Sequence, residues 1–240
     1  METADLASLV TSRLAAMTTA GIAALTTAEA VALTTAQSAA LTTNQVAALS
    51  TANVAALETA DLYAMKTIQV AAFTTAQIAA LGTSQIVSLG SSQVAGLTTL
   101  QMASLTTASL NALTTTQFAA MKTSQVASLT TAQVAALETA DLAAMTTLQV
   151  ASFTTAQMAA LSTSEMVSLT TLQVAGMKTS QMASLTTASL NSLTTTQFAA
   201  LTSNQAAGLT TAQVAALETA DLAVLKTSSL VSLTTAGIAA

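Results

Sequence analysis

The chain is built from an eight-residue unit that repeats without interruption from residue 1 to residue 240. Cutting the sequence at every eighth residue gives METADLAS, LVTSRLAA, MTTAGIAA and so on to LTTAGIAA, with no insertion or deletion. The consensus of the thirty octads is L-T-T-A-Q-V-A-A, whose residues are numbered here as positions 1 to 8. A short fixed period is typical of architectures in which each unit packs on its neighbours. The sequence therefore predicts one continuous array over residues 1–240.

A second period of 80 residues lies above the octad. The string LETADL begins at residues 57, 137 and 217, and LTTASLN followed by LTTTQFAA begins at 105 and again at 185. Duplication of such a block lengthens an array without adding a new activity. Met1 fills position 1, where Met occurs five more times, and polar end-caps are missing. Because solenoids normally need such caps, we expect the chain to be an excerpt of a longer array.

Each octad carries the signals of its own short helix. The Q-V-A-A-L half is Ala-rich and does not alternate as a strand would. One continuous helix also fails, because its apolar stripe would rotate by about 80° per octad. With Thr at position 2 as N-cap, Gln at position 5 completes a T-x-x-Q capping box, and positions 1 and 6 form a hydrophobic staple. These features predict an all-α fold, an α-solenoid of very short helices with a thin Leu, Val, Met and Ala core.

Four details of this solenoid follow less directly from the sequence. Where position 2 is Glu, Lys or Gly, we expect the Thr at position 3 to cap the helix, and elsewhere either hydroxyl could do so. We expect the constant position 3 hydroxyls to be largely used by backbone hydrogen bonds. Small residues at positions 4, 7 and 8 would allow close packing. Two octads per turn suit back-to-back helices, and two divides evenly into the ten octads of a block.

Charged residues occupy only two of the eight positions. Because charged side chains are almost never fully buried unless paired, positions 2 and 5 are predicted to face solvent. At position 2 they are Glu2, Glu58, Lys66, Lys122, Glu138, Lys178, Glu218 and Lys226. At position 5 they are Asp5, Arg13, Glu29, Asp61, Asp141, Glu165 and Asp221.

The residues that catalysis usually requires are scarce. The chain has no His and no Cys, so activation of its many Thr and Ser hydroxyls lacks the usual partners. The recurring E-T-A-D unit could be a carboxylate pair or a calcium ligand set. We favour a surface Glu followed by an Asp that replaces Gln in the capping box, since calcium needs six to eight oxygen ligands. The sequence therefore predicts no enzyme and no catalytic, cofactor-binding or metal site.

Composition also limits the partners that we expect. The net charge of −5 is spread thinly with no basic run for nucleic acid, and no apolar stretch is long enough for a transmembrane segment. No small-molecule substrate is expected either. With 52% hydrophobic and 6% charged residues, self-association into an oligomer or filament through apolar surface is predicted. The Thr array raises ice binding or other surface binding as an alternative, although the Glu, Lys and Gly at position 2 would interrupt a flat face.

The octads LTTAQVAA at 129–136 and 209–216 resemble the L-T-T-x-Q-V-A-A arrays of very large bacterial surface proteins, often labelled adhesins or haem-utilisation proteins. The resemblance covers the whole chain and implies a rigid extracellular spacer, stalk or filament segment on a bacterial surface. Haem binding is not carried over, because the chain lacks His and Cys. The L-T-x-x-Q-V segment is also similar to the first helix of the DNA-reading repeats of plant-pathogen effectors. Their second helix and basic residues are missing, so DNA binding is not expected.

Overall fold

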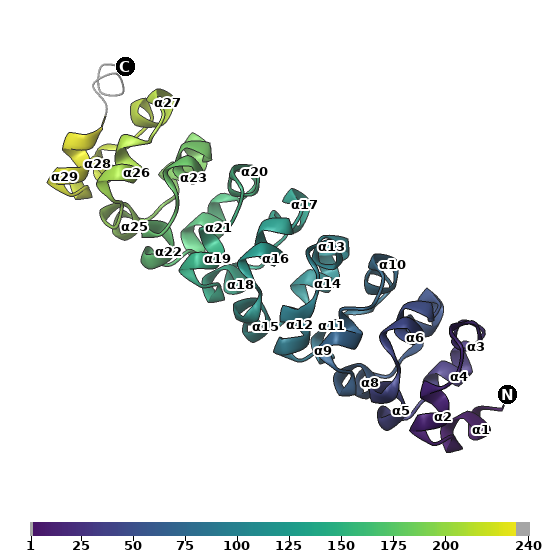
Figure 1. Cartoon of the computed structure of the whole chain (residues 1–240). Coiled ribbons are helices and arrows are strands. Elements are labelled where there is room, and N and C mark those ends of the chain that lie inside the picture. Colours follow the sequence, from purple (N-terminus) through teal and green to yellow (C-terminus); the bar gives the residue numbers. More distant parts are fainter. Residues whose placement is uncertain (1, 234–240) are drawn as a thin grey trace. The chain divides into compact units, whose positions relative to one another are not determined.

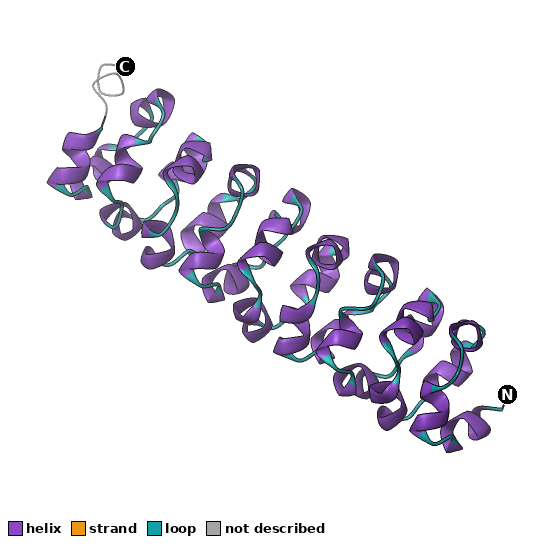
Figure 2. Cartoon of the chain, viewed as in Figure 1, coloured by secondary structure: helices purple, strands orange, loops and turns teal. Residues whose placement is uncertain are grey.

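The computed structural model describes residues 2–233 of the chain. Within this range the regular elements are α-helices of four to six residues, and no strand is present (Figure 2). Helices recur at the octad period, each beginning at position 3 of its octad. The expected α-solenoid of very short helices, one per octad, is confirmed.

The helices fall into two compact units, Met1–Met121 and Lys122–Ala240 (Figure 1). The first unit contains α1 (Thr3–Ser8), α2 (Thr11–Ala15), α3 (Thr19–Ala23), α4 (Thr27–Val31), α5 (Thr35–Ala40), α6 (Thr43–Ala48), α7 (Thr51–Ala56), α8 (Thr59–Ala64), α9 (Thr67–Val70), α10 (Thr75–Ala79), α11 (Thr83–Ser88), α12 (Ser91–Gly96), α13 (Thr99–Ser104), α14 (Thr107–Asn111) and α15 (Thr115–Ala120). The second contains α16 (Thr123–Ser128), α17 (Thr131–Val134), α18 (Thr139–Ala144), α19 (Thr147–Val150), α20 (Thr155–Ala159), α21 (Thr163–Ser168), α22 (Thr171–Ala175), α23 (Thr179–Ser184), α24 (Thr187–Asn191), α25 (Thr195–Ala199), α26 (Ser203–Ala207), α27 (Thr211–Ala215), α28 (Thr219–Val224) and α29 (Thr227–Ser232).

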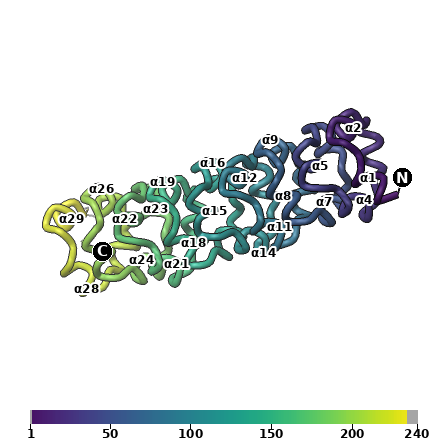
Figure 3. The backbone as a smooth tube through the Cα atoms, turned by 90° about the horizontal axis from the view of Figure 1, so that it is seen from below, coloured from purple at the N-terminus to yellow at the C-terminus, as the bar shows by residue number. Residues whose placement is uncertain are grey.

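Within each unit, one turn of the solenoid takes between three and four octads. Helices pack on the helix three places further along, as α5 does on α8 and α26 on α29. Hydrogen bonds between turns join residues 28 and 31 apart. In the first unit, α3, α6, α10 and α13 follow one edge (Figure 1). Figure 3 shows the backbone closing into successive turns. The preference for two octads per turn is wrong, because three positions per octad point inward and need a wider turn.

The helix of each octad begins at position 3 whatever residue stands before it. In α10 the Thr74 hydroxyl accepts the Gln77 N–H at 3.2 Å, while Gln77 Oε1 accepts the Thr74 N–H at 2.6 Å, which completes the predicted capping box. Lys66 and Gly82 are also N-caps, and their N–H groups donate to the Gln side chain at position 5. The expectation that position 3 would take over as cap in such octads is wrong. The Gln carbonyl fixes the helix start from within the helix.

In several octads the helix ends at position 8, directly before an extended position 1, and in the others its C-cap at position 7 or 8 still has αR angles. Leu57, for example, has φ −57° and ψ 139° and follows the last helical residue of α7. No residue of the described chain has a positive φ. The connection therefore needs neither Gly nor Pro, which explains how turns can recur every eight residues in a chain with seven Gly and no Pro.

Positions 1 and 6 form the core, as predicted. Val46 and Leu49 are 0% and 4% exposed, and Phe118 is fully buried. Full burial of such a side chain contributes about 1.5–3 kcal/mol. Positions 2, 3 and 4 face solvent in most octads. The expectation that position 4 packs against a neighbouring backbone is therefore wrong, and Leu100 at position 4 is 72% exposed.

Candidate functional site

The polar side chain at position 5 joins one turn of the solenoid to the turn before it. In α10, Gln77 Nε2 donates to the carbonyl of Val46 at 3.0 Å and to that of Leu49 at 2.6 Å. Both carbonyls lie at the C-terminal end of α6, where helix carbonyls are the last to find backbone donors, and that of Val46 also accepts the Leu49 N–H. Gln77 Oε1 meanwhile holds the start of its own helix. One amide thus caps two helix ends that lie in successive turns.

The same arrangement recurs through both units, and we call this row of amides the glutamine ladder. In the first unit its members are Gln37, Gln45, Gln69, Gln77, Gln85, Gln93, Gln101 and Gln117. In the second they are Gln157, Gln173, Gln181, Gln197, Gln205 and Gln213. All are between 1% and 7% exposed. The prediction that position 5 faces solvent is therefore wrong, because this side chain is a contact between turns.

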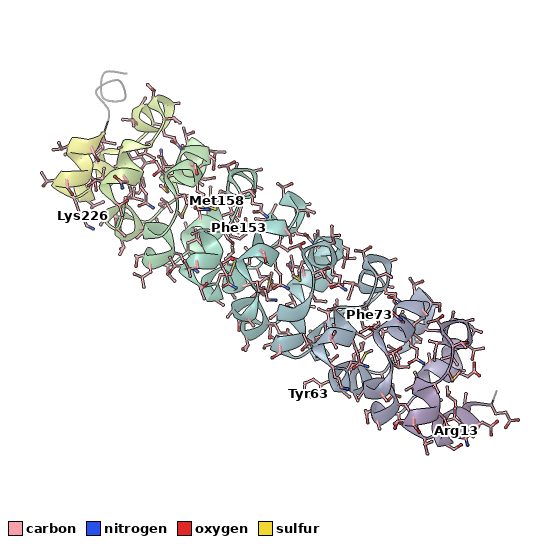
Figure 4. The ribbon with its side chains drawn as sticks, in the orientation of Figure 1. Arg13, Tyr63, Phe73, Phe153, Met158 and Lys226 are labelled. Carbon is pink, nitrogen blue, oxygen red and sulfur yellow. The ribbon has the colours of Figure 1, made fainter. Side chains whose placement is uncertain are left out.

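The charged residues that led to the prediction of an exposed position 5 fall into two groups. Asp5 and Arg13 lie in the first turn of the described residues and pack on no earlier turn among those residues, and both are exposed (Figure 4 shows Arg13). Glu29, also in the first turn, accepts hydrogen bonds from the Thr26 N–H and hydroxyl, both at 2.8 Å. The remaining acidic residues at position 5 are buried between turns.

Shorter neutral side chains at position 5 keep part of the ladder. Asn53 Nδ2 donates to the carbonyl of Leu25 at 2.9 Å, and Ser229 Oγ donates to that of Leu201 at 3.1 Å. Each reaches the carbonyl 28 residues earlier and not the one 31 residues earlier. A side chain at position 5 can therefore bind the preceding turn through a single hydrogen bond to the position 1 carbonyl.

The Asp residues of the E-T-A-D units occupy the same buried place without a donor. Asp61, Asp141 and Asp221 are 1%, 4% and 4% exposed. Burial, and secondly the negative charge of Glu58, raise the pKa of Asp61 to about 6. Burial and Glu138 do the same for Asp141, with a pKa of about 6. The pKa of Asp221 is raised by burial and by Glu218.

The expected capping role of Asp holds only in the first turn. Glu2 and Asp5 form a capping box at α1, and the Glu2 N–H donates to Asp5 Oδ2 at 3.3 Å. The helices α8, α18 and α28 have the same E-T-A-D sequence but no capping box. The Glu of each pair faces solvent as predicted, and so does Asp5, whereas Asp61, Asp141 and Asp221 are buried.

A second contact between turns brings position 8 against position 3. A Cβ atom at Gly96 would overlap the Thr67 Cγ2, and the same holds for Gly176 with Thr147. Ser232 Oγ donates to the Ser203 carbonyl at 2.9 Å across the same contact. Position 3 is therefore constrained by packing. The position 3 hydroxyls do not cap the helices, since position 2 is the N-cap, as predicted for octads with Thr there, and position 3 is exposed in most octads.

Large apolar side chains are exposed at a few places. At position 4 they are Ile68 and Leu100 in the first unit and Leu148 and Leu172 in the second, all at least 66% exposed. Helices α19 and α22, which carry Leu148 and Leu172, pack against each other. Tyr63 at position 7 is 68% exposed and points outward in Figure 4.

Nowhere in residues 2–233 do three or more His, Cys, Asp or Glu side chains come together as they would around a metal ion. Among the same residues, no helix has the length and hydropathy needed to cross a membrane.

Comparison with known proteins agrees with the repeat architecture. The chain matches the ALTTAQ repeat in segments 1–35, 54–91, 80–107, 94–131, 134–171, 174–211 and 214–240, which together cover most of its length. A search of curated proteins found no match.

Proposed function

Because the chain belongs to the ALTTAQ repeat family, we propose that it is a structural element, a rigid spacer or filament-forming segment of a bacterial extracellular fibre or adhesin. The glutamine ladder supports this proposal most directly. Each turn binds its neighbour through the same hydrogen bonds, so an array lengthens by adding octads without a new kind of contact.

The extracellular setting rests on the sequence resemblance to bacterial surface arrays. A chain without Cys needs no oxidative folding, which is compatible with a surface location. Antibodies raised against the purified chain should label intact cells of the source organism. Labelling only after the cells are permeabilised would contradict the surface location.

The spacer proposal predicts that length follows the number of octads. Deletion of residues 137–216 removes one 80-residue block and joins Ala136 to Leu217 in phase, with LETADL restored. Electron microscopy should show a proportionally shorter particle with the same helical circular dichroism per residue. Deletion of residues 137–212 is the matched control, because it breaks the phase by four residues and should disturb folding. An unchanged length after the in-phase deletion would contradict the proposal.

Self-association would use the exposed apolar side chains. Leu148 and Leu172 lie on packed helices and are 73% and 74% exposed, so together they offer apolar surface to another chain. The double substitution Leu148→Ser and Leu172→Ser should lower the average mass in sedimentation measurements. Ala156→Ser, at the exposed position 4 of α20, is the control. An unchanged mass distribution would exclude these residues from the contact.

Exposed position 3 hydroxyls favour ice binding as a second candidate. Thr75 and Thr115 are exposed, and Thr or Ser is kept at this position in every octad. A turn of between three and four octads argues against it, because equivalent hydroxyls then do not align in straight rows. Thermal hysteresis in a freezing assay would reverse this ranking, and its absence would leave the spacer as the sole candidate.

A further inference from the structure

The buried Asp residues interrupt the glutamine ladder at defined places. Asp61 in the first unit and Asp221 in the second stand where neighbouring octads place a Gln amide against two carbonyls. An amide is a permanent donor, whereas a carboxyl group donates only when it is protonated. The state of these two side chains therefore decides whether their octads bond to the turn before.

The carbonyl that each Asp faces can be identified from the register. Asn has the same shape as Asp, and Asn53 reaches the carbonyl of Leu25, 28 residues earlier. The equivalent carbonyls are those of Leu33 for Asp61 and Leu193 for Asp221. Among the described residues, the Oδ2 atoms of Asp61 and Asp221 are buried without a hydrogen-bond partner. Each carboxyl group is thus placed beside an acceptor with no donor to separate them.

Among the described residues, no cation acts on these carboxylates. Helix α8 packs on α5 and α11, whose sequences TAQSAA and TSQIVS contain no charged residue. Helix α28 packs on α25, whose sequence TTQFA is also uncharged. The charged groups that act on the two Asp residues are Glu58 and Glu218, each three residues earlier on the surface, and both are negative. Ionisation at either place therefore adds an uncompensated charge between turns.

We propose that Asp61 and Asp221 are proton-dependent joints of the solenoid. In the protonated state the carboxyl O–H donates to the carbonyl of Leu33 or Leu193, and the turns are joined as in a glutamine octad. On ionisation the proton leaves to solvent, that hydrogen bond is lost, and carboxylate and carbonyl oxygens face each other. The array is then closed in mild acid and opens locally at these two octads near neutral pH.

The direction of the pH effect follows from the raised pKa of the two carboxyl groups. The pKa of Asp61 is about 6 in the folded chain, against an ordinary value of 3.8. A group whose pKa is raised by folding stabilises the fold at low pH, and this contribution is lost as pH rises through the folded value. The stabilisation should therefore be complete below about pH 4 and largely absent above about pH 6 to 7.

Hydrogen exchange of the full chain, compared with the double variant Asp61→Asn and Asp221→Asn, tests this proposal. Asn donates at every pH, as Asn53 does, so the variant should keep both octads closed. The ratio of wild-type to variant exchange rates in α8 should rise by up to about tenfold per pH unit between pH 4 and 6, and the ratio in α28 should rise in the same direction. Taking the ratio at each pH removes the intrinsic pH dependence of exchange. The exposed Asp5→Asn is the control and should leave this dependence unchanged.

Two results would overturn the proposal. The first is a wild-type to variant ratio that does not change with pH. The second is protection of the wild-type octads by calcium at neutral pH that the variant loses, because a cation and not a proton would then occupy the joint. If the variant folds poorly, carbon-13 titration of the Asp61 carboxyl in the unmodified chain replaces it. A midpoint near the ordinary value for Asp would then contradict the proposal.

Discussion

The first turn of the solenoid and the turns that follow it use the same octad in different ways. In α1 and α2, Asp5 and Arg13 occupy position 5 and are exposed. In α5 and α6, Gln37 and Gln45 occupy the same position and are 1% and 2% exposed, bonded to carbonyls of α1 and α2 and of the residues that follow them. Position 6 is buried in both regions, where Leu6 and Val46 are both 0% exposed. What position 5 does is therefore set by the turn beneath it and not by its own octad.

Two carboxylates show the same contrast. Glu29 in the first turn receives hydrogen bonds from the Thr26 backbone and hydroxyl, which lower its pKa. Asp61, one turn later, is buried against the preceding turn, and its pKa is raised to about 6. One residue is held as an anion by donors of its own helix, and the other lacks such donors. The contrast follows the donors that each side chain reaches, since Glu165 in an interior turn also accepts the N–H of its N-cap residue, Ser162.

The largest effect is expected when an interior ladder residue is removed. Gln77→Ala removes the amide donor to the carbonyls of Val46 and Leu49, of which Val46 keeps the Leu49 N–H, and it removes half of a capping box. We expect a loss of about 2–4 kcal/mol in the free energy of unfolding, measured in urea. Arg13→Ala changes position 5 of the first turn and should have little effect. Equal effects of the two substitutions would remove the distinction between the regions.

A smaller loss is expected where two turns approach most closely. Gly96→Ala places a methyl group against the Thr67 Cγ2, which should cost about 1–3 kcal/mol in thermal unfolding. Gly82→Ala, at the exposed position 2, meets only the Gln85 side chain at 3.8 Å and should be tolerated. Adding Thr67→Ser to Gly96→Ala removes the clashing methyl and should restore most of the stability. Without that rescue, the contact between positions 3 and 8 would not be the cause.

The smallest effect is expected at the caps, and it should be alike in both regions. Thr18→Ala in the first turn and Thr74→Ala in the interior each remove a hydroxyl that accepts the N–H of position 5. Each should lower local stability by about 1 kcal/mol, measured by hydrogen exchange in α3 and α10. A much larger loss at Thr74 would show that capping, too, depends on the neighbouring turn.

The sequence predicts what is decided within one octad. Three features involve residues at most five apart: the cap at position 2, its capping box with position 5, and the packing of positions 1 and 6. Such features are visible in the repeat itself. The contact of Gln77 with Val46 and Leu49 joins residues 31 and 28 apart, and its register depends on the number of octads per turn. Charged residues at position 5 were misleading because they come from the uncovered first turn and from buried acidic exceptions. A comparison of the position 5 residues of the first four octads with those of the later octads would have indicated that position 5 differs between the two regions.

Glu165 allows the most direct measurement of the ladder. It stands at position 5 of α21, where its Oε2 accepts the Ser162 N–H at 2.6 Å, while its Oε1 is buried without a partner among the described residues. Glu165→Gln keeps the helix cap and adds an amide that can donate to the carbonyls of Val134 and Leu137, the residues 31 and 28 places earlier. The account predicts a gain of about 1–2 kcal/mol in the free energy of unfolding at neutral pH. An unchanged or lower stability would contradict the claim that position 5 amides bind successive turns together.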